Sequence, residues 1–340
     1  MSATKHTEAV GVLAKVETTY NTPITLSTST DGVRIIKPRP DLTINYGYDG
    51  GRGGQAGGFG QRHRATPTGR TVAGTIRCEA KGHGSAYTSS SVVVPHIHPL
   101  LRAAGFDATV DTSGGTENWV FSPTLGTGTM ASNTLRFYTR GEQFDAAGCY
   151  TGLKINIDGA GIPTWEFPFV GTLATAVADT ALPAITYHTN SVIPPVATGI
   201  ALTYGTFTGA IVRSATFDLG RQIDNPRVNV NSSAASAGYQ PGPRTPTLEM
   251  LIESTALQGS PYYAATAIDP YQLYAASTAL TWSLTVGSVQ YNKYKLSGSV
   301  AQLMAPPELV DEGSVGLWRI KLALGASTAV AADDIVLTFN

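Results

Sequence analysis

The chain has 340 residues, a length that suits one large β domain or two domains of about 150 residues each, and we favour two. Charged residues make up only 14% of the sequence, well below the roughly 25% of an ordinary soluble domain, so much of the surface must be Thr, Ser, Ala and Gly. Such a surface is easily buried against other proteins. The formal net charge of -1 excludes a global attraction for nucleic acid.

Short segments of alternating polar and apolar residues predict a mainly β protein. The first clear strand is TVAGTIRCEAK, residues 71–81, in which every second side chain is apolar. PHIHPLLRAAG, residues 95–105, predicts a short helix that begins at a proline and ends at a glycine. YTGLKINIDG and TWEFPFVG, residues 150–159 and 164–171, predict a hairpin. Pro168 favours an edge or a bulge for the second of these strands.

Three segments of the first half find partners in the second half, in the same order. Arg70-Thr71 aligns with Arg244-Thr245, which places Ile76 on Met250. The helix segment PLLRAAG aligns with YQLYAAS, and TWEFPFVG aligns with LWRIKLAL. Each match preserves the inward face, which favours an internal duplication over one irregular β domain with coincidental alternation. We therefore predict two tandem domains, residues 1–185 and 200–340, joined by a proline-rich linker at 186–199.

A glycine-rich loop, residues 46–69, precedes the first clear strand. It cannot pack a core and is too long to be an idle connection inside a compact domain. Two readings stay open, a mobile surface loop and a loop that orders against a neighbouring subunit. The second reading would use aromatic anchors and arginines, namely Tyr46, Tyr48, Arg52, Phe59, Arg62, His63 and Arg64. The second half has only SSAASAGYQP at the corresponding place, so we expect the extension in the first half alone.

Signatures of catalysis are weak in this sequence. GRGGQA, residues 51–56, fits a loose dinucleotide pattern, but more glycine follows where a helix is required. His96 and His98 lack a third metal ligand, and Cys78 and Cys149 lack metal spacing and predict free buried thiols. We expect no enzyme, cofactor or metal. The sequence offers neither a signal peptide nor a membrane helix, so we expect synthesis in the cytoplasm and no membrane insertion.

Residues 8–172 resemble the tail tube proteins of long-tailed, siphovirus-type bacteriophages. The resemblance rests on VGVLAKVETTYNTP at 10–23, the long loop, the helix LLRAAGF and the hairpin CYTGLKINIDGAGIPTWEFPFVG. It implies β-sandwich or barrel domains, each with a short flanking helix, whose inner strands join into a continuous barrel around a channel. Six such domains form a ring, and the N-terminal arm and the long loop reach the next ring. With two domains per chain, three copies would complete a ring of pseudo-sixfold symmetry.

The resemblance also implies a structural role in the virion tail. Double-stranded DNA would pass through the channel without specific binding, and the implied partners are other copies of the chain, the tape measure protein, the tail terminator and the distal tail proteins. Because phosphate contacts with Lys and Arg would retain DNA, the family's lumens are acidic or neutral. Candidate lumen acids are Glu79, Glu249 and Glu253, although an outer solvated face fits them equally well. The alternative function is a two-domain β-sandwich binding module, such as a receptor-binding or adhesin-like protein.

Overall fold

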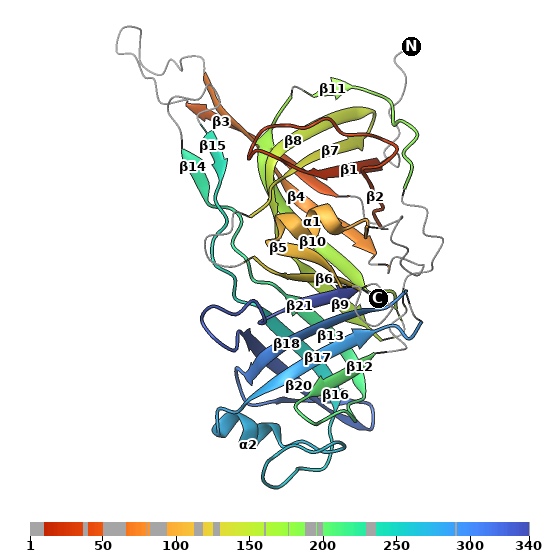
Figure 1. Cartoon of the computed structure of the whole chain (residues 1–340), viewed down its shortest axis with the longest axis vertical. Coiled ribbons are helices and arrows are strands. Elements are labelled where there is room, and N and C mark those ends of the chain that lie inside the picture. The colour runs from red at the N-terminus through yellow and green to blue at the C-terminus, as the bar shows by residue number, and fades with distance from the viewer. Residues whose placement is uncertain are drawn as a thin grey trace.

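The computed structural model describes residues 10–36, 40–49, 66–79, 81, 94–111, 118–124, 130–159, 161–175, 177–187, 195, 200–228, 236–289 and 291–339. It is mainly β, as the alternating segments predicted. In Figure 1 the strands of the first half fill the upper part of the molecule and most strands of the second half fill the lower part, while β14 and β15 of the second half lie in the upper part near β3.

The strands of the first half are β1 (Val10–Val16), β2 (Gly32–Val33), β3 (Asp41–Asp49), β4 (Thr66–Glu79), β5 (Phe106–Asp111), β6 (Asn118–Pro123), β7 (Asn133–Thr139), β8 (Glu142–Thr151), β9 (Lys154–Asp158), β10 (Thr164–Leu173) and β11 (Ala178–Asp179). Those of the second half are β12 (Ala201–Tyr204), β13 (Val212–Asp218), β14 (Pro226–Val228), β15 (Ser236–Tyr239), β16 (Thr247–Glu253), β17 (Ala279–Val286), β18 (Tyr294–Leu303), β19 (Glu308–Glu312), β20 (Val315–Gly325) and β21 (Val336–Phe339).

Each half also carries one short helix, α1 (His98–Ala103) and α2 (Pro270–Ala275). Both have a proline in the first turn, where its missing N–H costs nothing. Asp269 caps α2 by accepting hydrogen bonds from the backbone N–H groups of Tyr271 and Gln272. The predicted helix at 95–105 and its predicted counterpart at 271–277 are therefore both confirmed, as α1 and α2.

The two halves use the same pattern of antiparallel pairing. In the first half β4 pairs with β3 and β10, and β10 turns its other edge to β9 and then to β8. In the second half β16 pairs with β13 and β20, while β20 turns its other edge to β19 and β18. The outer layer continues from β8 to β7 and β1, and from β18 to β17 and β12.

Pro168 lies inside β10, a strand with partners on both sides, rather than on an edge strand. Its carbonyl accepts a hydrogen bond from Gly152 N at 2.7 Å, in the break between β8 and β9. Because the N–H and C=O of one strand residue point to the same side, the missing N–H faces this break and removes no bond to β4. The proline is tolerated at the point where the partner changes.

One hydrophobic core runs through both halves. Trp165 of β10 meets Tyr294 of β18 edge to face, with ring centroids 5.1 Å apart. Phe121 of β6 meets Phe339 of β21 in the same geometry at 5.6 Å. Each of these rings is at most 1% exposed. Aromatic pairs of this kind contribute about 1 kcal/mol beyond their burial, so they help to fix the two halves against each other.

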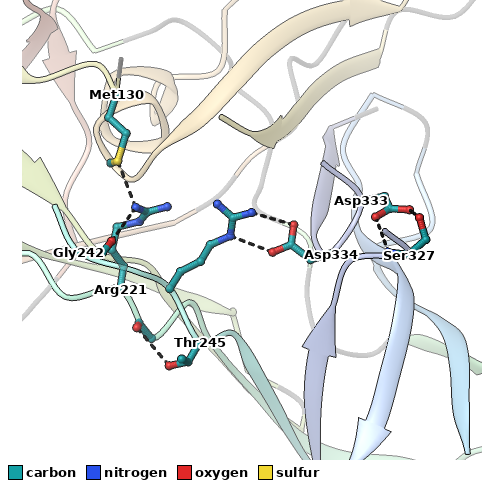
Figure 2. Close-up of polar contacts among 9 residues, drawn as sticks. Met130, Arg221, Gly242, Thr245, Ser327, Asp333 and Asp334 are labelled. Carbon is teal, nitrogen blue, oxygen red and sulfur yellow. Dashed lines mark hydrogen bonds and ion pairs between the residues drawn. The ribbon is translucent and has the colours of Figure 1, made fainter. Parts of the chain in front are cut away.

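Polar contacts lie beside the start of β21, and one of them, from Arg221 to Met130, crosses between the halves (Figure 2). Arg244, just before β16, donates two hydrogen bonds to Asp334, at 2.8 and 3.1 Å. Nearby, Arg221 donates to the Met130 sulfur at 3.1 Å and to the Gly242 carbonyl at 3.3 Å. Burial of this guanidinium lowers the pKa of Arg221 to about 10.

Removal of the Asp334 carboxylate tests the strength of this ion pair, which lies within the second half. Asp334 is only 6% exposed, so its loss would leave the Arg244 cation in a poorly solvated site. We expect Asp334→Ala to lower the free energy of unfolding by about 3 kcal/mol, measured by urea denaturation. Glu308→Ala is the matched control because Glu308 pairs with Arg319 at 2.8 Å on the surface, and it should cost less than about 1 kcal/mol. Equal costs for the two variants would contradict a buried structural ion pair.

Candidate assembly interface

Two antiparallel pairs of strands join the halves: β6 pairs with β21, and β9 pairs edge to edge with β13. β9 of the first half pairs with β13 of the second, with Ile155 opposite Phe217 and Lys154 opposite Asp218. The backbone N–H of Leu219 extends the ladder by donating to the Leu153 carbonyl at 2.9 Å. The result is one continuous sheet, which we call the joined sheet, in the order β3-β4-β10-β9-β13-β16-β20-β19.

The residues that lie opposite each other in the joined sheet show which positions of the two halves correspond. Trp165 lies opposite both Cys78 and Ile155, and Trp318 lies opposite both Ile252 and Leu309. The sequence match had already aligned Cys78 with Ile252 and Trp165 with Trp318. Leu309 of β19 thus occupies the position in the second half that Ile155 of β9 occupies in the first.

Both ends of the joined sheet are open edges among the residues that the structure describes. At one end β19 pairs only with β20, and at the other β3 pairs only with β4. Leu309 is 70% exposed, whereas its counterpart Ile155 is fully buried beside β13. Unpaired N–H and C=O groups along such edges are sites for another strand to add.

A hollow of about 280 Å³ lies beside the β3 edge. Leu42 and Ile44 of β3 form one wall, and Phe144 of β8 and Arg140 of the β7–β8 turn form the other. Leu42 and Ile44 are only partly buried, although their side chains point toward the core. Neither this edge nor β19 was predicted from the sequence. For β19 the reason is that PPELVDE is too short and too acidic to show apolar alternation.

The three candidate lumen acids lie on one face of the joined sheet, the face turned away from the core. Each has a cationic partner: Glu79 with Lys81 at 3.7 Å, Glu249 with Arg319 at 3.7 Å and Glu253 with Arg213 at 2.6 Å. The acids on this face are Asp41, Glu79, Asp158, Glu166, Asp218, Glu249, Glu253, Glu308 and Glu312. They outnumber the bases there, which are Arg77, Lys81, Lys154, Arg213, Arg319 and Lys321.

The predicted loop 46–69 begins and ends as paired strand. Tyr46 lies opposite Arg70 and Tyr48 opposite Pro67, so β3 and β4 continue as a two-stranded arm, which projects at the upper left of Figure 1. The remaining proposed contact residues, Arg52, Phe59, Arg62, His63 and Arg64, lie outside the described residues.

The expectation that only the first half has a long extension was wrong. The chain between β13 and β16 runs from residue 219 to 246 and contains the β14–β15 pair. This segment reaches back onto the first half, where the Tyr20 hydroxyl donates to the Tyr239 carbonyl at 2.8 Å and accepts from the Tyr239 N–H at 2.5 Å. The strand before this connection is β13, which ends at Asp218, so SSAASAGYQP is only the later part of the connection.

The turn that carries Tyr20 is held by a buried carboxylate. Glu17, 7% exposed, accepts hydrogen bonds from Ser132, Thr134, Asn21 N and Gly148 N, at 2.6 to 2.9 Å. Four donors satisfy this carboxylate, and hydrogen bonds to an ionised group are stronger than those between neutral groups. The VETTY segment thus fixes the platform against which β15 packs.

No cluster of metal-ligating side chains occurs in the described part of the chain. His98 packs against Trp119 and Phe121 at the start of α1, and burial lowers its pKa to about 4. Cys78 and Cys149 are free and buried as predicted, and burial raises the pKa of both thiols. Within the described ranges neither helix is long and apolar enough to cross a membrane.

The geometry defines a class of protein, namely a mainly β subunit with one continuous sheet and two open edges. A family model described as phage tail tube protein matches residues 7–336, nearly the whole chain, and the chain belongs to that family. The family is one of structural phage tail proteins rather than enzymes. Among curated proteins, none matches the chain.

The buried imidazole predicts a pH dependence of stability. The unfolded chain binds a proton at His98 below about pH 6.5, whereas the folded protein binds it only near pH 4. Stability from the neutral imidazole is therefore complete above pH 6.5 and falls as the pH drops toward 4, by at most a few kcal/mol at about 1.4 kcal/mol per pKa unit. We expect the melting temperature of His98→Phe to fall less over this range than that of the unaltered protein. Identical pH profiles in thermal melts would contradict a buried neutral His98.

Proposed function

We propose that the chain is a duplicated tail tube subunit, of which three copies form a ring with pseudo-sixfold symmetry. Family membership makes it a structural component of the phage tail tube, in the virion tail. The finer proposal is carried by the correspondence of the halves, in which β3-β4-β10-β9 matches β13-β16-β20-β19 in order and in register. Residues 1–185 and 200–340 are then the two tube domains.

The dimensions of such a ring suit a DNA channel. Eight strands of the joined sheet from each of three chains make a barrel of 24 strands. At about 4.8 Å between strands and a tilt of about 40°, the barrel is about 150 Å around and nearly 50 Å across between backbones. After side chains are allowed for, roughly 40 Å of clear width remains, against roughly 20 Å for a DNA duplex.

The charge of the joined sheet supports the same proposal. Its outward face would line the channel, and there acids outnumber bases. Glu79, Glu249 and Glu253 hold Lys81, Arg319 and Arg213 in ion pairs, which reduces the contacts that these cations can make with phosphate. The lining then lets DNA slide, as delivery of a genome requires.

The β3–β4 arm supports a role in stacking of the rings. The arm projects from the body, and its glycine-rich tip carries the aromatic residues and arginines that suit a protein contact. The tape measure, terminator and distal tail proteins are the further partners that a tail tube subunit would meet. The family match favours a tail tube subunit over the alternative of a β-sandwich binding module.

Electron microscopy of the purified protein tests the proposal. We expect tubes with a channel of about 40 Å, formed alone or with initiating tail proteins. Deletion of residues 50–60 should leave the melting temperature nearly unchanged and yield single rings that do not stack, because the deletion removes no residue of β3 or β4. A protein that stays monomeric under all these conditions would favour the binding module. Loss of the fold on deletion would show that the tip belongs to the core.

A further inference from the structure

We propose that neighbouring copies join by pairing β19 of one chain with β3 of the next, antiparallel, with Leu309 opposite Leu42. This inference rests on the proposed ring and names the two strands and the register that close it. The pattern for the contact is the β9–β13 joint inside each chain.

The register proposed for β19 and β3 follows from the residues that correspond between the two halves. Leu309 corresponds to Ile155, since both lie opposite the matched tryptophans Trp318 and Trp165. Phe217 lies opposite Leu248, and Leu42 lies opposite Gly74.

The alignment of Ile76 with Met250 also aligns Gly74 with Leu248, so Leu42 corresponds to Phe217. Ile155 lies opposite Phe217 within the chain. The same pairing between chains places Leu309 opposite Leu42 and Glu308 opposite Thr43.

Burial and shape support this partner. Leu309 is 70% exposed on the core side of β19, and the hollow beside Leu42 and Ile44 lies where that side chain would arrive. At the equivalent place inside the chain, Ile155 is fully buried and its neighbour Trp165 packs on Tyr294. A second copy would thus bury an apolar side chain that the single chain leaves in water.

Charge supports it as well. β19 carries three acids, Glu308, Asp311 and Glu312, around its two apolar residues. The hollow that β19 would approach is lined by Arg140 but also by Asp41 and Glu142, so its charges do not select a partner by themselves. Repulsion between two strongly acidic strands disfavours pairing of β19 with another β19, which leaves the β3 edge as its partner.

Disulfide trapping in assembled tubes tests the register. In the joint inside the chain, Leu219 and Leu153 form a hydrogen-bonded pair, so Asp218 and Lys154 form the next, non-hydrogen-bonded pair. Thr43 and Glu308 correspond to these two residues, and their Cα atoms should lie about 4.5 Å apart, within disulfide range. Both side chains are exposed in the single chain, so cysteines there should not disturb the fold.

The variant Thr43→Cys with Glu308→Cys, assembled under reducing conditions and then oxidised, should give covalent dimers and trimers on a non-reducing gel. The matched control, Thr43→Cys with Glu312→Cys, places the cysteines about 13 Å out of register and should give none. The native Cys78 and Cys149 are buried in the core and should not interfere. Tubes that form without cross-linking at 43 and 308, or with equal cross-linking in the control, would overturn the pairing and leave the ring proposal standing.

A charge at Leu309 gives an independent measurement. Leu309→Asp should leave the melting temperature of the monomer unchanged, because the side chain is exposed, and should abolish rings as measured by light scattering. Val330→Asp is the control, since Val330 is 81% exposed and lies outside both edges, and Leu309→Ile should assemble normally. Assembly of Leu309→Asp at the unaltered level would overturn the inference. Failure of the unaltered chain to form rings would instead overturn the proposed function.

Discussion

Backbone hydrogen bonding between β9 and β13 is the interaction on which the rest of the structure depends. It turns two halves, each with its own outer layer and helix, into one sheet, and together with the β6–β21 pair it brings their aromatic side chains into a common core. A strand pair satisfies N–H and C=O groups only at the edges that it joins. The same geometry therefore leaves one unsatisfied edge at each end, β3 and β19, within the part of the chain that the structure describes.

Two unlike open edges on one chain are suited to a closed ring. A head-to-tail contact repeats until the rotation closes, and closure removes every edge that could otherwise recruit strands without limit. In the proposed ring, fusion of two domains in one chain would mean that half of the six joints are already formed when the chain folds. Only the remaining joints pay the cost of association. The exposed Leu309 and the acidic β19 then help to determine which edge is accepted.

The sequence predicted those helices and strands whose formation depends on neighbouring residues in the chain. Alternation in TVAGTIRCEAK identified β4, and the proline and glycine around LLRAA identified α1. Long-range partners were not predictable, because periodicity says nothing about which strand lies next to which. Pro168 illustrates this limit, since it tolerates a central strand only because β8 gives way to β9 beside it. Among the proposed site residues, the three candidate lumen acids lie on one face of the joined sheet. Leu309 was not predicted, because its strand β19 is short and mostly charged.

The mass of the smallest closed ring tests the central claim most directly. If both halves of the chain contribute equivalent wall segments, native mass spectrometry of rings released from tubes should give three times the 35.6 kDa of one chain. A ring of six chains would contradict the account, because only one half of each chain could then lie in the wall around a channel of this width.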